Sequence, residues 1–482
     1  MGRLDNLQPK KVFEYFESLC NIPHGSYNCK AVSDYCVQFA KDRGLEWIQD
    51  DAYNVIIKKS ASSNYKGNST LILQGHLDMV CQKTTESTID FEKDPLDLQI
   101  DGDFLFAKGT SLGGDDGIAV AYALAVLDDD TLKHPNLEVV FTTEEEVGML
   151  GASALDTSSL KAKYLLNIDS EEEGILIASC AGGNVTKAVI PVQYQSENGD
   201  LHELTIQGLL GGHSGTEIDK NHANSHKLLG EVLSVLNRKN AKIVSIGGNE
   251  DQKDNAIPSY SYVSFLADDV AIFKEEVGHL KEKWETAYDE SEDGICVSIE
   301  SKVQGINTKV LTKESAESVE RFLKNSINGV QTMSTDIEGL VESSLNLGII
   351  HMNDTEFTAT FGVRSSVASL MDTMFETEQK VIESCGGTIE RLSEYPGWEY
   401  RKDSLLREQF VKAYKELFGQ DMKVEAIHAG LECGILGAKI PDLDMVAFGP
   451  DIFDIHTVKE RLSISSTKRV WELLLKIIEE FP

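Results

Sequence analysis

Short apolar runs alternate with a longer helical pattern in the first third of the chain, and an apolar run returns near its end. The runs at 71–75, 137–143, 164–168 and 445–449 lead into small or polar residues and predict buried strands. The alanine- and leucine-rich stretch at 117–130 predicts a helix that packs on them. Strands alternating with helices indicate an α/β sheet with helices on both faces, which binds ligands beyond the carboxyl ends of its strands.

The middle of the chain has a different pattern. Strands with alternating polar and apolar residues are expected at 185–194, 202–209, 261–267 and 357–366, beside an amphipathic helix at 224–239. This pattern predicts an α+β domain with an antiparallel sheet.

The segment 298–345 is rich in Ser, Glu and Lys and suggests a helix plus loops. From about residue 398 the first pattern returns, with helices expected at 404–419 and 466–481. We therefore expect residues 1–185 and 398–482 to form one α/β domain, interrupted by an inserted domain at 186–397.

Composition narrows the class of protein. The 482 residues include 41% hydrophobic and 26% charged residues, which is typical of a globular protein of at least two domains. The formal net charge of -34 argues against nucleic-acid binding and raises the local concentration of cations. No run is long enough to cross a bilayer, and the first twenty residues lack the apolar core of a secretory signal. The eight scattered cysteines form no CxxC pair, so we expect a cytoplasmic protein that does not bind membranes.

Polar residues with metal-binding chemistry follow these predicted strands. His76 and Asp78 come directly after the first run, at a spacing that lets His76 bind a metal while Asp78 orients its ring. Taken alone, this triplet is more often a polar strand end. Asp169 follows the strand at 164–168, and His456 follows a strand near the C-terminus.

Two acidic clusters strengthen the pattern. Asp115 and Asp116 follow two glycines at the start of the predicted helix, where a single Asp would be an ordinary N-cap. Asp115 is the candidate for a carboxylate that bridges two ions. The glutamates at 144–146 follow a buried strand between apolar residues, so cations are expected to neutralise them, although such runs are usually solvated. One glutamate would bind metal and its neighbour would act as a general base, and the residues alone do not say which.

Two histidines and three carboxylates without a thiolate suit two divalent ions. Zn²⁺ is the first candidate, with Co²⁺ and Mn²⁺ as alternatives.

The order of motifs resembles a known family, the co-catalytic di-zinc metallopeptidases, and among them the aminoacyl-histidine dipeptidases (Xaa-His dipeptidase, peptidase D type). The motifs are HLD, GGDDG, TEEEVG, NIDSEEEG and FGPDIFDIHTVKE, together with IPHGS, CAGG, GGHSG and HAGLECG. The resemblance covers essentially the whole chain. It implies an α/β fold with a di-zinc peptidase-type mixed sheet flanked by helices, and an inserted α+β lid domain.

The resemblance also assigns roles to residues. It implies that Glu145 is the general base, because Gly148 sets the register, and that Asp78 orients His76. The implied metal ligands are His76 and Asp169 for one ion, Glu146 and His456 for the other, and Asp115 as the bridge.

In this family the inserted domain is a lid that often carries dimer contacts, so a homodimer is expected. His213 would stabilise the oxyanion, and Asn255, Arg364 and Gly430 would contact the substrate. Ordinary alternatives are a turn position for His213 and a structural ion pair for Arg364.

The sequence departs from the family at two positions. GGDDG stands where GADNG is expected, which adds the charge of Asp116 beside the bridge, and Glu144 stands where Asp is common.

The resemblance implies metal-dependent hydrolysis of dipeptides, of Xaa-His type or broader, by a metal-bridging water that a glutamate activates. The substrate would be a small peptide. The alternatives are an N-acyl amino acid amidohydrolase, which would share the metal residues, and a dinuclear phosphohydrolase.

Overall fold

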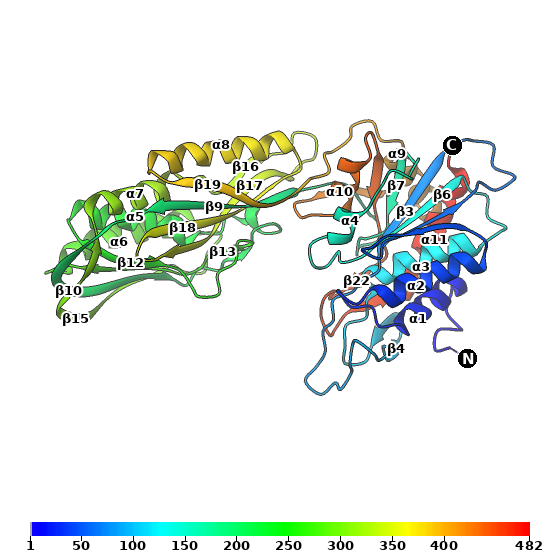
Figure 1. Ribbon diagram of the computed structural model, residues 1–482, viewed down its shortest axis with the longest axis horizontal. Coiled ribbons are helices and arrows are strands. Elements are labelled where there is room, and N and C mark those ends of the chain that lie inside the picture. The colour runs from blue at the N-terminus through cyan, green and yellow to red at the C-terminus, as the bar shows by residue number, and fades with distance from the viewer. Residues whose placement is uncertain (1) are drawn as a thin grey trace. The chain divides into compact units, whose positions relative to one another are not determined.

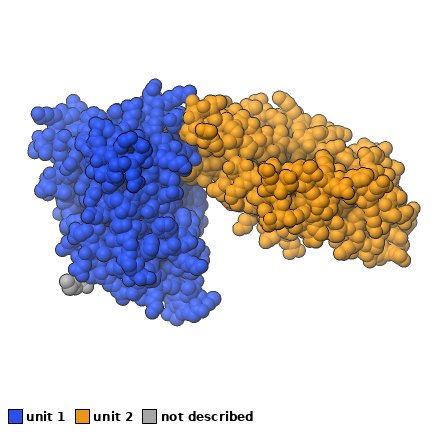
Figure 2. Space-filling model, turned by 180° about the vertical axis from the view of Figure 1, so that it is seen from behind, with its two compact units in different colours: residues 1–179, 400–426, 431–482 blue, residues 180–399, 427–430 orange. Residues whose placement is uncertain are grey.

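The computed structural model describes residues 2–482 and divides into two compact units, which Figure 2 colours separately. Unit 1 comprises residues 1–179, 400–426 and 431–482, and unit 2 comprises residues 180–399 and 427–430. The short segment 427–430 thus belongs to unit 2, although it lies inside the predicted C-terminal part of the α/β domain. The predicted bounds of the two domains, 1–185 with 398–482 and 186–397, stay a prediction.

Unit 1 is built around a mixed eight-stranded sheet with the order β1-β2-β6-β3-β7-β21-β8-β20. Figure 1 labels its strands β3, β6 and β7. Strand β3 pairs in parallel with β6 and β7, and β21 pairs in parallel with β7. The strands are β1 (Glu46–Gln49), β2 (Val55–Lys59), β3 (Thr70–His76), β6 (Asn136–Thr142), β7 (Tyr164–Asn167), β8 (Ile175–Cys180), β20 (Lys423–Ile427) and β21 (Asp444–Ala447). The four apolar runs correspond to β3, β6, β7 and β21.

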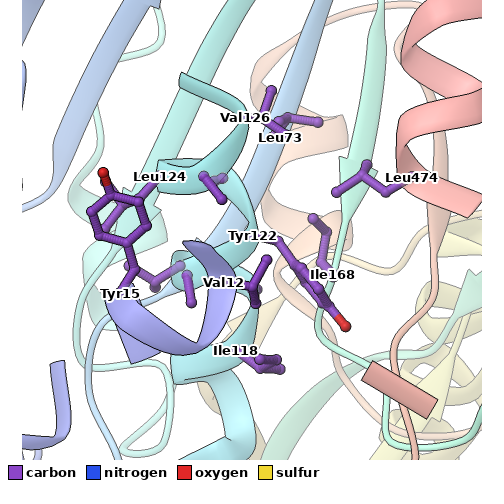
Figure 3. Close-up of a cluster of buried hydrophobic side chains, with 14 of the residues drawn as sticks. Val12, Tyr15, Leu73, Ile118, Tyr122, Leu124, Val126, Ile168 and Leu474 are labelled. Atoms are coloured by element: carbon purple, nitrogen blue, oxygen red, sulfur yellow. The ribbon is translucent and has the colours of Figure 1, made fainter. Parts of the chain in front are cut away.

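Helix α3 (Gly114–Asp128) packs between this sheet and α1 (Lys10–Cys20). Every residue of α3 from Gly114 to Leu127 is buried, as expected for a helix that is apolar all round. Alternate strand residues such as Leu73 join it in one core cluster (Figure 3). The other helices that contribute to this cluster are α2 (Lys30–Asp42), α9 (Leu405–Phe418) and α11 (Ile464–Glu480).

Smaller elements complete unit 1. The helices α4 (Leu150–Ala154) and α10 (Glu432–Lys439) contact each other. A second, four-stranded sheet has the order β22-β23-β5-β4. Its strands are β4 (Leu98–Asp101), β5 (Phe104–Ala107), β22 (Ile452–Phe453) and β23 (Arg461–Ser463).

Unit 2 contains antiparallel sheets and four α-helices among residues 180–399. One sheet has the order β16-β17-β18-β9-β19 and another the order β12-β14-β10-β15, and β11 pairs with β13. The strands are β9 (Gly182–Pro191), β10 (Tyr194–Gln207), β11 (Gly212–His213), β12 (Lys242–Gly247), β13 (Ala256–Ile257), β14 (Ser261–Leu266), β15 (Cys296–Leu311), β16 (Gly329–Met333), β17 (Val341–Met352), β18 (Glu356–Ser365) and β19 (Thr388–Tyr395). The helices are α5 (Ser225–Arg238), α6 (Ala271–Ala287), α7 (Lys313–Asn325) and α8 (Ala368–Ser384).

The interpretation of residues 298–345 as a helix plus loops is only partly correct. Helix α7 is present, but β15 is a sixteen-residue strand, and β16 and the start of β17 also lie in this segment. Strand β15 pairs with β10 at the edge of its sheet, so its Ser, Glu and Lys side chains remain largely exposed and show no clear apolar alternation.

The predicted fold class is confirmed: an α/β mixed sheet flanked by helices, interrupted by an α+β segment. None of the helices within residues 2–482 has the length and apolar character needed to span a bilayer.

Candidate metal centre

Three neighbouring strands of the large sheet end beside one another with metal-binding residues. His76 is the last residue of β3, Glu145 and Glu146 follow β6, and Asp169 follows β7. Because β6, β3 and β7 run parallel in that order, their carboxyl ends meet at one edge of the sheet.

The carboxylate of Asp115 lies between two histidines. Its Oδ1 is 3.1 Å from His76 Nε2, and its Oδ2 is 3.0 Å from His456 Nε2. Asp115 stands in the first turn of α3 in a non-helical conformation, and it is 8% exposed. Each oxygen of this side chain therefore faces a different histidine.

The remaining predicted ligands pair with the same two histidines. Asp169 Oδ1 is 3.7 Å from His76 Nε2, and Glu146 Oε1 is 3.0 Å from His456 Nε2. His456 follows β22 with a φ of 60° and, unlike the other ligands, is nearly half exposed. The five predicted ligands thus form two groups that share Asp115.

Asp116, the additional charge noted in the sequence, is buried beneath this cluster. Its Oδ2 accepts a hydrogen bond of 3.1 Å from the backbone N–H of His76. A Cβ atom on Gly75 would lie 2.6 Å from the same oxygen, so only glycine permits this approach. Asp116 also lies close enough to His76 and Asp169 to be an alternative ligand.

The protein alone does not neutralise the negative charge of the cluster. Burial and the charge of Asp116 raise the pKa of Asp169 well above its usual value, and burial also raises the pKa of Asp116. Burial disfavours the charged form of His76, but hydrogen bonds with Asp115 and Asp78 outweigh it and raise the pKa of this ring. Carboxylates crowded in this way favour a bound cation.

These residues fit two divalent ions. Tetrahedral Zn²⁺ holds its ligands about 2 Å away and therefore about 3.3 Å from one another. The distances of 3.0 to 3.7 Å between the ligand atoms match that spacing. Apart from its 3.0 Å approach to His456 Nε2, the buried Oε1 of Glu146 has no hydrogen-bond partner among residues 2–482, which suits a metal ligand.

Asp78 organises the segment that carries the candidate base. Its carboxylate accepts hydrogen bonds from the backbone N–H groups of Glu145 (3.0 Å) and Glu146 (3.3 Å) and from Ser26 Oγ (2.9 Å). The nearest acceptor to His76 Nδ1 is the backbone carbonyl of Asp78 at 3.0 Å, with the Asp78 carboxylate at 3.5 Å. Asp78 thus contacts the His76 ring mainly through its main chain.

The Glu145 side chain lies in a largely buried position beside other acidic groups. Burial and the carboxylates of Glu432, Glu146 and Asp115 raise its pKa to about 8, against the opposing effect of His76. Cations at the cluster would favour the ionised form, which is the form that can accept a proton.

The sequence reasoning missed two buried glutamates beside this centre. Glu432 accepts hydrogen bonds from Gln74 (2.5 Å) and Thr142 (2.6 Å), and burial raises its pKa to about 7. Glu460 accepts hydrogen bonds from the backbone that leads into Asp115. Both lie within quoted motifs, HAGLECG and HTVKE, but nothing in their spacing separates a buried carboxylate from a solvated one.

The predicted substrate residues all belong to unit 2. His213 lies on β11, Arg364 lies on β18, the exposed Asn255 precedes β13, and Gly430 follows β20. The backbone carbonyl of Asn255 accepts a hydrogen bond of 2.9 Å from the N–H of Ser214, the residue after His213.

Arg364 and two histidines lie near one another in unit 2. Burial and then the charge of Arg364 lower the pKa of His213, and the same two causes lower the pKa of His428 to about 4. His428, which was not assigned a role from the sequence, hydrogen-bonds through Nε2 to Ser344 Oγ at 2.7 Å. The structure thus brings His213 and Arg364 together and adds His428.

Comparison with known proteins identifies the family. The model of peptidase family M20/M25/M40 matches residues 72–480. The chain therefore belongs to this family of peptidases.

Individual relatives agree with this assignment. The chain is 34% identical to the cytosol non-specific dipeptidase of Escherichia coli strain K12, and the match covers all of both chains. The aminoacylhistidine dipeptidase of Vibrio alginolyticus superimposes with a TM-score of 0.90 at 33% identity, covering 100% of this chain and 98% of the other. A tripeptidase from Staphylococcus aureus shares the fold, with a TM-score of 0.59, 14% identity and 98% of each chain covered. The resemblance expected from the motifs is confirmed.

Proposed function

We propose that this protein is a di-metal dipeptidase that hydrolyses the peptide bond of short substrates. The observation that carries the proposal is Asp115, whose two carboxylate oxygens face two histidines from distant parts of the chain. The proposed ligands are His76 and Asp169 for one ion, Glu146 and His456 for the second, and Asp115 as the bridge. Membership of a peptidase family and the names of two full-length relatives support a peptide substrate.

Two bound divalent ions would lower the pKa of a water molecule and polarise the scissile carbonyl. Glu145 takes the proton from the attacking water and delivers it to the nitrogen of the leaving amine. Asp78 holds the Glu145 segment through the hydrogen bonds that it accepts from the two backbone N–H groups. The water oxygen bonds to the carbonyl carbon, the C–N bond of the peptide breaks, and the proton that Glu145 takes from the water leaves on the amine.

Arg364 is the proposed anchor for the free carboxylate of the substrate. No carboxylate within residues 2–482 forms an ion pair with it, and its guanidinium donates one hydrogen bond, to Tyr395 Oη at 3.3 Å. A guanidinium binds a carboxylate through two parallel N–H groups, which would restrict substrates to short peptides. His213 would donate a hydrogen bond to the developing oxyanion, and Asn255 and Gly430 would contact the substrate backbone. The inserted domain would then act as the lid.

The relatives differ in the substrates that their names give. One is called non-specific and the other aminoacylhistidine dipeptidase. We propose a broad range of dipeptides that includes Xaa-His substrates.

The test uses protein stripped of metal and reconstituted separately with zinc, cobalt and manganese. We expect hydrolysis of Ala-Ala, Gly-His and β-Ala-His, and loss of activity when the C-terminal carboxylate is amidated. Faster cleavage of N-acetyl amino acids would make the protein an amidohydrolase, and faster cleavage of a phosphoester would make it a phosphohydrolase. Either result would overturn the proposal.

The location and the assembly are further proposals. The E. coli relative is named a cytosol enzyme, which supports a cytoplasmic location for this chain. The homodimer rests on the family resemblance, and sedimentation equilibrium tests it by giving twice the 53.2 kDa mass of one chain.

A further inference from the structure

Glu460 accepts hydrogen bonds from four consecutive backbone N–H groups. Its Oε2 accepts from Leu112 (2.7 Å) and Gly113 (3.1 Å), and its Oε1 accepts from Gly114 (2.8 Å) and Asp115 (3.4 Å). The side chain is only 3% exposed. A buried carboxylate is costly unless it is fully hydrogen-bonded, and this one is.

The two glycines of GGDDG contribute to this arrangement in different ways. Gly113 adopts the left-handed conformation, with φ 69° and ψ 31°, which turns successive N–H groups toward one point. A Cβ on Gly113 would lie 2.8 Å from Met79 Sδ, and a Cβ on Gly114 would lie 3.3 Å from Glu460 Oε1. Gly113 thus permits the turn, and Gly114 leaves room for the Glu460 carboxylate beside it.

The two segments that Glu460 connects both carry proposed metal ligands. Asp115 is the last of the four N–H donors, and His456 lies four residues before Glu460 in the same loop. That loop is itself closed by a hydrogen bond of 3.2 Å from the N–H of Glu460 to the carbonyl of Thr457. One side chain thus links the bridging carboxylate to the exposed histidine.

We propose that Glu460 is a positioning residue that holds Asp115 and His456 at the separation required for metal binding. It would touch neither an ion nor the substrate. The inference rests on the proposed metal site, because it concerns the residues assigned as ligands there.

The test compares Glu460→Gln with Glu138→Gln. A glutamine at 460 has one acceptor oxygen, and its amide N–H groups would face backbone donors. Glu138 is the matched control, because it is also 3% exposed and accepts hydrogen bonds from the backbone N–H groups of Lys161 and Ala162, where no ligand is proposed. Zinc dissociation constants are measured on stripped protein by competition with a chromophoric chelator, beside the melting temperature.

We expect Glu460→Gln to weaken zinc binding by about 10-fold or more, and the control to bind zinc as the wild type does even if it melts earlier. Glu460→Asp keeps the charge and should fall between Glu460→Gln and the wild type, which provides a second variant if the glutamine does not fold. An unchanged zinc affinity in both Glu460 variants would overturn the positioning role alone. A wild-type protein that binds no divalent ion would overturn the metal site and this inference together.

Discussion

Glu145 differs from its neighbours in the glutamate run by its surroundings. Its backbone is fixed by Asp78, and its carboxyl has a pKa raised to about 8 by burial and nearby acids. Glu144 instead accepts a hydrogen bond of 2.6 Å from the backbone N–H of Tyr27. Of these two glutamates, Glu145 is therefore the one suited to move a proton at the metal centre.

Replacing the proposed base should separate chemistry from metal binding. We expect Glu145→Gln to lower kcat by about 10²- to 10⁴-fold, because proton transfer is lost, while two ions per chain remain bound. Steady-state kinetics and metal analysis by mass spectrometry measure the two effects. The control is Glu144→Gln, which should keep kcat within a few-fold of the wild type. Equal loss in both variants would refute the assignment of the base.

Glu378 on α8 makes the stability of unit 2 depend on pH. Burial raises the pKa of this carboxyl to about 7, partly offset by the hydrogen bond of 2.5 Å from the N–H of Ile327. A folded-state pKa above the unfolded value means that ionisation destabilises the fold. This cost is absent below about pH 4.5 and complete above about pH 7, where it reaches about 3 kcal/mol.

Glu378→Gln should remove this dependence, because the amide does not ionise. The variant should gain stability over the wild type as the pH rises from 5 to 7.5, measured by chemical denaturation at several pH values. The same difference in unfolding free energy at both ends of this range would show that Glu378 does not titrate as its burial implies.

The residues alone indicated four of the five ligand positions, and the family motif was needed to choose between Glu145 and Glu146 in the glutamate run. The structure brings the five proposed ligands together. Local spacing could not reveal Glu460, since its four partners lie about 345 residues earlier in the chain. His428 was missed for a related reason: its hydrogen bond with Ser344 and the effect of the Arg364 charge on its pKa depend on how strands β17 and β18 fold.

At the scale of elements, strand β9 tolerates no side chain at its first position. A Cβ on Gly182 would lie 2.3 Å from the backbone N of Gly397 and 2.7 Å from the carbonyl oxygen of Tyr395 at the end of β19. We expect Gly182→Ala to destabilise unit 2 by about 2 kcal/mol or more, because backbone on both sides must shift. Thermal denaturation measures the effect.

The matched control lies in helix α6. A Cβ on Gly278 would meet no atom of residues 2–482 within 4 Å, so Gly278→Ala should stabilise the helix by about 0.5 to 1 kcal/mol. If Gly182→Ala left the stability of the protein unchanged, β9 and β19 would separate at this position more easily than their contacts suggest.

The pattern of apolar residues predicted buried elements better than exposed ones. Strands β3, β6 and β7 are buried on both faces and appear as continuous apolar runs. Strand β15 is mostly exposed, so its long backbone pairing with β10 holds it in the sheet, and not the burial of its own side chains. The residues of β15 alone do not predict this pairing, because it depends on where β10 lies in the fold.

At the scale of the whole molecule, the candidate metal centre lies entirely within unit 1. A ligand that binds only the folded state raises the unfolding temperature of the part that binds it. We expect calorimetry to resolve two unfolding transitions. Only one of them should shift to a lower temperature when the metal is removed. Gly182→Ala should lower the other, which assigns that transition to unit 2. A single transition that shifts as a whole would show that the units unfold together.

The position of β21 in the sheet has a consequence for co-translational folding. This strand, residues Asp444–Ala447, pairs with both β7 and β8 in the middle of the large sheet. During synthesis on the ribosome, all of unit 2 except the segment 427–430 leaves the exit tunnel before β21 exists. Strands β7 and β8 therefore lack the strand that pairs with both of them until the last tenth of the chain emerges. Unpaired strand edges of this kind promote aggregation. Translation that stalls before residue 444 would leave these two strand edges unpaired. Truncated chains should therefore need chaperones more than the complete chain does.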